Sequence, residues 1–317
     1  MASSDKASLP TDHPSQFKVE VCTHIGGRPR QEDRFFVRND ITVPGNNEVG
    51  FFGVWDGTVD PHASDFVHTR CCDHHLASNG FQEYNSLLEN GNNIQQNKIA
   101  KCLVQATEEG YAATDQECLQ SCHELRNHYS SCTSVTCIVA SGILTVGHLG
   151  DSRLYLLEYQ GDQLKGTCLT DDHKPDDPEE RARIERSGGS IQLLTHHHNK
   201  PFIRGGDFDR RKATGERVMQ LQYSRAFGGK DLKPFGLSAK PTVSQVELGP
   251  QHAGFVLCSD GVSDVCTDQN AALIVGAARA RGEDAAATLT GWAMKERARV
   301  GIGADNITSV VVWFNPN

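Results

Sequence analysis

The chain has 317 residues and a mass of 34.7 kDa, enough to bury a large core in one domain or two. Its formal net charge of -9, from 31 basic and 40 acidic residues, disfavours a surface that binds the nucleic-acid backbone. Mean hydropathy is -0.46, and no apolar run approaches the roughly 18 residues of a membrane-spanning helix. We therefore expect a soluble protein that binds neither nucleic acid nor membrane.

The start of the chain and its cysteines indicate the compartment. Residues 1–5 lack the basic and then apolar build of a secretory signal, and Ala2 stands where N-myristoylation needs a glycine. The eleven cysteines are an odd number and several lie in apolar runs, which favours reduced thiols; their spacing matches no zinc site. We expect a monomer in the cytoplasm or nucleus that is not secreted.

The first half of the chain alternates short strands with amphipathic helices. Residues 1–16 are polar and interrupted by proline, so we expect a disordered tail before a single domain over 17–317. The β-rich runs 17–25, 33–38 and 48–55 predict three strands bounded by turns. Apolar positions at three-to-four spacing over 63–79 and 95–123 predict two helices that cover one face of a sheet.

The middle of the chain contains the most apolar strands. The runs 134–140, 143–149 and 154–158 are separated by Ser-Gly and Gly-Asp turns, which predicts an antiparallel meander at the centre of a sheet. An Asp cap, an early proline and two acids predict a helix over 175–187. Residues 190–217 have no clear period and are rich in His, Gly, Asp and Arg, which favours a long exposed loop or flap.

The last third completes the predicted fold. Strands are expected at 218–224, 243–247, 254–258 and 306–314, with a helix over 268–298. Strands, two helices, more strands, a helix and a last strand predict an α+β fold. The expected architecture is a four-layer αββα sandwich, in which two antiparallel β-sheets are flanked by helix pairs.

Three acidic turns at strand ends are the candidate metal ligands. Asp56 follows the run 51–55, Asp260 follows 254–258, and Asp305 precedes 307–314. Asp56 and Asp260 are 204 residues apart and Asp260 and Asp305 are 45 apart, so only a folded core can bring them together. One Asp-Gly pair is more often just a turn. Three strand-linked carboxylates without His or Cys instead favour Mg²⁺ or Mn²⁺, which prefer oxygen ligands.

Seven motifs, in order, resemble those of the metal-dependent Ser/Thr protein phosphatases, the type 2C (PPM) family, over residues 18–314. They are Arg28-Pro29-Arg30-Gln31-Glu32-Asp33, Phe51 to Gly57, Gly150-Asp151-Ser152-Arg153, Leu169 to Pro175, Ser224-Arg225-Ala226-Phe227-Gly228, Ser259 to Val265, and Asp305-Asn306-Ile307-Thr308. The resemblance implies an antiparallel β-sandwich flanked by helix pairs. It also implies hydrolysis of phosphoserine and phosphothreonine in proteins, through a water or hydroxide that bridges two metal ions.

The resemblance assigns metal ligands by motif position. Asp56 would bridge two Mg²⁺ or Mn²⁺ ions, and Gly57 would lend its carbonyl to one of them. Asp260 and Asp305 would hold the other ion. A weaker third ion is expected between Asp151, Asp260 and Asp264, although the first and last of these carboxylates could instead only cap turns. The run His196-His197-His198 looks like a metal cluster, but adjacent loop residues cannot all face one ion.

The resemblance also assigns the residues that act on the substrate, with Arg28, Glu32 and Asp56 as the catalytic set. Arg28 would grip the substrate phosphate bidentately, and Glu32 would hydrogen-bond the metal-bound waters. Simpler alternatives are open for both residues. Arg28 could be a plain surface cation, and Glu32 could pair with Arg28 or Arg30.

The chain departs from the family pattern at two positions. The family has a histidine after Asp-Gly that is thought to donate a proton to the leaving group, and here that position is Thr58. Thr58 cannot replace a general acid, so activity could be reduced. His62, four residues later, could fold back as a substitute donor or simply begin a helix. Gly229 stands where the family has an aspartate. These changes leave open a pseudophosphatase that binds without turnover, whereas a two-metal nuclease conflicts with the net charge.

Overall fold

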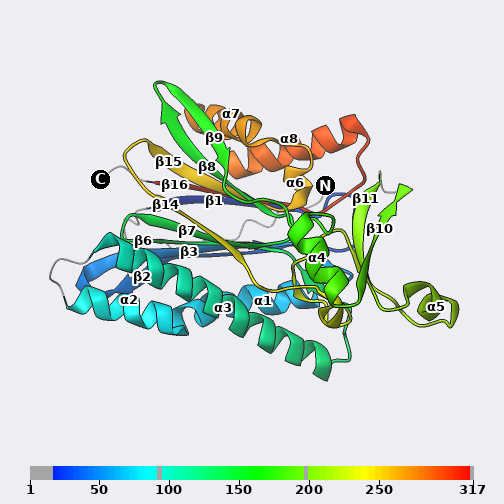
Figure 1. Ribbon diagram of the computed structural model, residues 1–317. Coiled ribbons are helices and arrows are strands. Elements are labelled where there is room, and N and C mark those ends of the chain that lie inside the picture. The colour runs from blue at the N-terminus through cyan, green and yellow to red at the C-terminus, as the bar shows by residue number, and fades with distance from the viewer. Residues whose placement is uncertain (1–16, 91–94, 196–198, 315–317) are drawn as a thin grey trace.

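Two β-sheets packed face to face form the centre of the computed structural model, and helices cover both outer faces (Figure 1). The structure describes residues 17–90, 95–195 and 199–314. The predicted tail over 1–16 lies outside these residues. The α+β, four-layer arrangement predicted from the order of strands and helices is confirmed.

The first sheet has the strand order β14-β7-β6-β3-β2 and is antiparallel throughout. Its strands are β2 (Arg34–Val43), β3 (Asn47–Trp55), β6 (Ser134–Ala140), β7 (Ile143–Leu149) and β14 (Thr242–Glu247). Every residue of β6 and β7 is buried, because these central strands are covered by the second sheet on one face and by helices on the other.

The second sheet has the order β1-β16-β15-β8-β9 and is also antiparallel. Its strands are β1 (Phe17–His24), β8 (Arg153–Gln160), β9 (Gln163–Cys168), β15 (His252–Cys258) and β16 (Ile307–Phe314). Phe52 of the first sheet packs edge to face on Phe255 of the second at 5.4 Å between ring centroids. Such contacts hold the two inner faces together and stabilise the sandwich.

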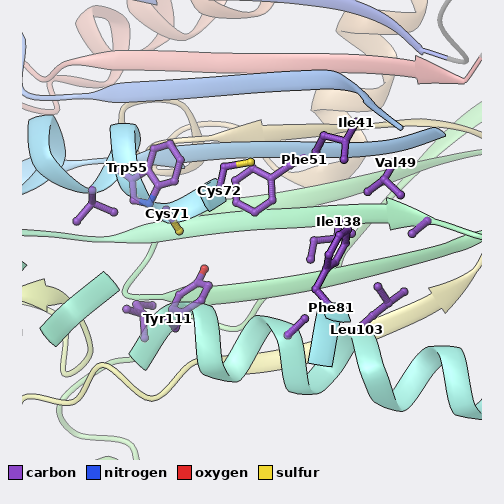
Figure 2. Close-up of a cluster of buried hydrophobic side chains, with 14 of the residues drawn as sticks. Ile41, Val49, Phe51, Trp55, Cys71, Cys72, Phe81, Leu103, Tyr111 and Ile138 are labelled. Atoms are coloured by element: carbon purple, nitrogen blue, oxygen red, sulfur yellow. The ribbon is translucent and has the colours of Figure 1, made fainter. Parts of the chain in front are cut away.

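Three helices cover the first sheet: α1 (His62–Ala77), α2 (Asn79–Glu89) and α3 (Gln96–Glu124). Figure 2 shows the core between them and the sheet, with Phe51 and Trp55 from the sheet facing Tyr111 and Leu103 from α3. The buried hydroxyl of Tyr111 donates to the carbonyl of Gly147 at 2.7 Å. A polar atom in this core therefore has a partner, as burial requires.

The second sheet is covered by α7 (Asp268–Ala280) and α8 (Ala285–Val300). The single helix predicted over 268–298 is therefore wrong, because the turn around Gly282 (φ +69°) ends α7 and Asp284 caps α8. The helix α2 was also missed: its first residues, Asn79-Gly80, are typical of a turn, but Ser78 caps a helix whose Phe81 and Tyr84 are buried. The one helix predicted over the second sheet is thus two helices, α7 and α8. The two helices predicted over the first sheet are three, α1, α2 and α3.

The predicted meander over 134–158 is wrong in its third strand. Residues of β8 pair with β15 and β9 of the second sheet, not with β7. The turn at Gly150 (φ +85°) carries the chain from one sheet to the other. Sequence periodicity cannot reveal this crossover, because a strand buried on both faces is apolar in either sheet.

The described part of the region predicted as a loop or flap over 190–217 has regular secondary structure and projects from one end of the sandwich (Figure 1). It contains β10 (Gly189–Leu194), β11 (Lys200–Gly205) and α5 (Phe208–Ala213), and β11 also pairs with β12 (Gln220–Leu221). Nearby lie α4 (Pro178–Arg186), β4 (Gly57–Thr58), β5 (Ser131–Cys132), β13 (Phe227–Gly228) and α6 (Asp260–Ser263); η1 (Pro44–Asn46) and η3 (Lys233–Phe235) are short 3-10 turns. The expected strand at 218–224 is shortened to β12.

The cysteines and the helices of the described residues bear on the predictions from composition. All eleven cysteines are described, and all have free thiols. None of the helices in the described ranges is long and apolar enough to cross a bilayer.

Candidate metal centre

The three acidic turns meet at one end of the sandwich. Asp56 follows β3, Asp260 begins α6 directly after β15, and Asp305 lies just before β16. Antiparallel pairing places Cys258 opposite Ser309, so the end of β15 and the start of β16 share one edge. Asp56, Asp260 and Asp305 all line one cavity of about 280 Å³, as Glu32 and Arg28 do. Carboxylates distant in sequence are thus brought together, as predicted.

Backbone contacts fix the turn that carries Asp56. Its N–H donates to Thr133 Oγ1 at 3.2 Å, and its carbonyl accepts from the Thr133 N–H at 2.9 Å. The N–H of Gly57 donates to the carbonyl of Glu32 at 3.2 Å. A Cβ on Gly57 would lie 2.6 Å from that carbonyl and 2.7 Å from Ser64 Oγ. Only glycine fits this close approach between two strand ends.

Asn306 joins the Glu32 segment to the start of β16. Its Oδ1 accepts from the N–H of Glu32 at 2.7 Å, while its Nδ2 donates to the carbonyls of Ile25 and Arg30, both at 2.9 Å. The side chain of Glu32 lines the cavity, and burial raises its pKa. None of the described ion pairs joins Glu32 to Arg28 or Arg30, and Arg28 pairs with Asp305. Asn306 belongs to the last of the seven motifs, but the resemblance assigns it no role.

Three carboxylates form an inner group that has no ion pair among the described residues: Asp33, Asp56 and Asp260. Asp33 and Asp260 are buried, and one oxygen of each has no hydrogen-bond partner in the described structure. Asp56 is partly exposed to the cavity. Burial, reinforced by Asp260, raises the pKa of Asp56 well above its usual range. Burial and the charge of Asp305 do the same for Asp260.

Asp33 belongs to the inner group by the same criteria, although sequence analysis gave it no function. It lies between Glu32 and the first residue of β2, and its Oδ2 accepts from Ser259 Oγ at 2.8 Å. Burial raises its pKa to about 6. In the part of the chain that the structure describes, no Lys or Arg forms an ion pair with an inner carboxylate, and burial raises the pKa of all three.

An outer group of carboxylates, Asp151, Asp264 and Asp305, is paired with cations of the protein. Asp305 accepts from Arg28 at 3.0 Å and from Arg297 at 3.3 Å. Asp151 contacts Lys174 at 2.8 Å. Asp264 contacts Arg297 at 3.6 Å and Lys200 at 3.8 Å. These ion pairs hold the outer carboxylates around the inner ones.

Arg297 contacts the carboxylates of the site, and the sequence alone did not single it out. It is only 5% exposed and projects from the last turns of α8. Its guanidinium donates to the carbonyls of Asp260, Gly261 and Gly303 as well as to Asp305. Nothing in the sequence distinguishes this arginine from the others in a basic helix end, because its role depends on where α8 packs.

The donor chemistry of the inner group fits a hard divalent cation. Its members offer only oxygens, and the unpartnered Oδ1 of Asp260 lacks the positive charge that would lower its free energy. Asp305, a predicted ligand that belongs to the outer group, differs because both its oxygens already contact arginines. Within the described residues, no three His, Cys, Asp or Glu side chains are assembled as a closed ligand set. A metal ion would therefore compete with Arg28 for Asp305.

The residues proposed for a third ion are placed differently. Asp151 is buried and in contact with Lys174, whereas Asp264 is exposed at the edge of the site. Both carboxylates are near enough to Asp260 to raise its pKa. The His196–His198 run lies outside the described residues.

The structure also places the two positions that depart from the family pattern. Thr58 lines the cavity, and its Oγ1 accepts a hydrogen bond from the Tyr223 hydroxyl at 2.7 Å. Gly229 has a left-handed φ of +60°, and a Cβ there would lie 2.6 Å from Leu237. Any other residue at 229 would be strained in this turn.

His62 does not take the place of a proton donor in the cavity. It is the first residue of α1, and its Nε2 lies 3.1 Å from Ser121 Oγ on α3. It is absent from the residues that line the described cavity. The structure therefore agrees with the alternative that His62 begins a helix, and not with the alternative that it folds back toward the cavity.

A larger groove of about 890 Å³ adjoins the cavity. The two share Arg28, Thr58, Gln222, Tyr223, Asp260 and Asp305. Lys200 and Phe202 of β11 form one wall of the groove, and Ile302 lies on another. The carboxylate cavity thus opens into a space that extends beneath the projecting β10–β11 hairpin.

Comparisons with known proteins agree with this geometry. The family model described as protein phosphatase 2C matches residues 17–300. A crystal structure of serine-threonine phosphatase 2C from Toxoplasma gondii is 42% identical, covers 96% of this chain and 97% of its own, and has a TM-score of 0.89. Probable protein phosphatase 2C 69 of Arabidopsis thaliana is 31% identical over 94% of this chain and 70% of its own length. Probable protein phosphatase 2C 48 of Oryza sativa subsp. japonica is 32% identical over 64% of this chain and 57% of its own length.

Proposed function

This chain belongs to the protein phosphatase 2C family, and we propose that it is a metal-dependent protein serine/threonine phosphatase. Its substrates would be phosphoserine and phosphothreonine residues of proteins. The observation that carries this proposal is the meeting of Asp56, Asp260, Asp305 and Arg28 at one cavity that opens into a larger groove of about 890 Å³. A phosphoprotein is the expected partner, and the net charge of -9 argues against nucleic acid.

Asp56, the carbonyl of Gly57, Asp260 and Asp305 would hold two Mg²⁺ or Mn²⁺ ions. When bound, the ions would neutralise the carboxylates, polarise the phosphate and lower the pKa of the attacking water. A weaker third ion near Asp151, Asp260 and Asp264 is also part of the proposal. It would have to compete with Lys174 for Asp151 and with Arg297 and Lys200 for Asp264.

Arg28 would bind the phosphate of the substrate. It lies at the boundary between cavity and groove, and half of its side chain is exposed. Its guanidinium would exchange Asp305 for two phosphate oxygens, for which its planar fork is suited. Glu32, at the cavity wall, would accept a hydrogen bond from the attacking water. The bond from phosphorus to the side-chain oxygen breaks, which yields inorganic phosphate and a free hydroxyl.

A pseudophosphatase that binds phosphoproteins without turnover is the second candidate, and Thr58 is the observation that favours it. A general acid contributes roughly 10² to 10⁴ in rate, so its loss would slow the reaction without abolishing it. The retained carboxylates and Arg28 support an active enzyme, because a binding protein has no need of inner carboxylates without cations.

The test is release of inorganic phosphate from a phosphoserine peptide. We expect turnover with Mn²⁺, loss of turnover with a chelator, and at least a 10³-fold lower rate for Asp260→Asn. Asp162→Asn, in the exposed turn between β8 and β9, is the matched control and should keep the wild-type rate. Folded wild-type protein that shows no turnover at any Mn²⁺ concentration would favour the pseudophosphatase.

A further inference from the structure

A hydrogen bond joins Thr58 at the cavity to Tyr223, on the side of the groove that β11 and β12 form. Tyr223 follows β12, is only 3% exposed, and packs in a cluster with Ile203, Met219 and Leu221. Its hydroxyl donates to Thr58 Oγ1 at 2.7 Å. Thr58 lies in β4, which pairs with β5, so its backbone is fixed as well. The orientation of the Thr58 hydroxyl is therefore set from both sides.

The count of protons at this pair leaves one donor unused. The Tyr223 hydroxyl donates its only proton to Thr58 Oγ1, so the Thr58 hydroxyl must donate its own proton to a different acceptor. Among the described residues, no acceptor is in hydrogen-bonding contact with the Thr58 hydroxyl. Because Thr58 lines both the cavity and the groove, its free proton is available to a molecule bound there.

The location of Thr58 indicates which atom of a substrate it would meet. In the proposed function, the phosphate lies in the cavity of about 280 Å³ beside Asp56 and Glu32, and the rest of the peptide extends into the groove of about 890 Å³. The ester oxygen that joins phosphorus to the side chain must therefore lie at their boundary. Thr58 and Tyr223 are two of the residues that cavity and groove share.

We propose that Thr58, held by Tyr223, donates a hydrogen bond to the ester oxygen that leaves when the phosphate is removed. This inference rests on the proposed function. As the bond to phosphorus lengthens, negative charge grows on the ester oxygen, and the hydrogen bond stabilises that charge. Thr58 keeps its proton throughout, and the departing alkoxide takes its proton from water. Thr58 is thus a catalytic residue, and Tyr223 is a positioning residue.

The experiment compares two substrates that differ in their need for this hydrogen bond. A phosphoserine peptide has a poor leaving group, the serine alkoxide. The leaving group of p-nitrophenyl phosphate is p-nitrophenolate, a stable anion that needs no hydrogen bond to depart. We expect Thr58→Val to lower kcat/KM for the peptide by about 10- to 100-fold, the usual value of a hydrogen bond to a charged group, and for the aryl phosphate by less than about threefold. Tyr223→Phe should show the same pattern, about 3- to 10-fold on the peptide.

Three controls keep the result specific. Thr58→Ser retains the hydroxyl and should keep most of the activity on the peptide. Tyr84→Phe removes a tyrosine hydroxyl whose partner is Ser141, away from the cavity, and should leave both rates unchanged. Thermal unfolding of each variant establishes that it is folded.

The outcomes separate this inference from the function on which it rests. Equal losses on the two substrates, or no loss on the peptide, would overturn the role of Thr58 while the phosphatase activity stands. An unequal loss with Thr58→Val but none with Tyr223→Phe would overturn the positioning role of Tyr223. A wild type without metal-dependent turnover of either substrate would overturn the proposed function and this inference with it.

Discussion

The inner and outer carboxylates lie at the same end of the sandwich, but their charges are balanced differently. Asp151, Asp264 and Asp305 each contact at least one Lys or Arg. Asp33 and Asp260 are buried and have no ion pair among the described residues. A buried carboxylate without a cation is costly, and its raised pKa records that cost. Cations of the protein therefore already balance the outer group, whereas the balance of the inner group would have to come from a bound cation.

The largest expected effect tests the outer group. In Lys174→Met, Asp151 would be buried without its partner at 2.8 Å, which should lower the free energy of unfolding by about 2 to 4 kcal/mol. Urea unfolding of the metal-free protein measures this. The double variant Lys174→Met/Asp151→Asn removes both charges and should recover most of the loss. A single variant as stable as the wild type would break the comparison.

Metal binding tests the inner group. At a Mn²⁺ concentration about 100 times its dissociation constant, the wild type should gain about 2.7 kcal/mol of stability. Asp260→Asn should lose this gain, because it removes an inner ligand, whereas Asp162→Asn should keep it. Thermal unfolding with Mn²⁺ and with chelator measures both. Equal stabilisation of the wild type and Asp260→Asn would contradict the assignment of Asp260.

The pH dependence of stability tests Asp33. Its pKa is raised to about 6 in the folded protein, so the folded state binds the proton more tightly than the unfolded state. The stability contributed by this proton is complete below pH about 4 and is lost as the pH rises through about 6. From pH 4 to pH 7, the metal-free wild type should therefore lose about 2 to 3 kcal/mol relative to Asp33→Asn. Urea unfolding at several pH values measures the difference in stability between the two proteins. A difference that does not change with pH would show that folding does not raise the pKa of Asp33.

The smallest effect is expected at Asp264. Its ion pairs with Lys200 and Arg297 are long, at 3.8 and 3.6 Å, and the residue is exposed. Asp264→Asn should change the free energy of unfolding by less than about 1 kcal/mol. The same urea titration measures it. A loss as large as that of Lys174→Met would show that the outer carboxylates act as one network.

Much of the fold could be predicted from local patterns. Strand positions at 17–24, 143–149 and 307–314 follow from apolar runs bounded by turns, and α1 and α3 follow from helical spacing. The order of these elements was enough for the four layers. What failed were decisions that sequence does not encode locally: which sheet β8 joins, and where a long apolar helix is interrupted.

The candidate site shows the same division. Local patterns predicted the acidic turns at Asp56, Asp260 and Asp305, because a strand end followed by a tight turn can be recognised in a sequence, and the family resemblance singled out Thr58. The partners of these residues could not be predicted, because they depend on how the chain packs: Arg297 from α8, Lys174 beside Asp151, and Tyr223 on Thr58. These contacts join segments up to 165 residues apart, as for Tyr223 and Thr58. Charge balance and hydrogen bonding at the site therefore depend on packing, which brings side chains within reach regardless of their distance along the chain.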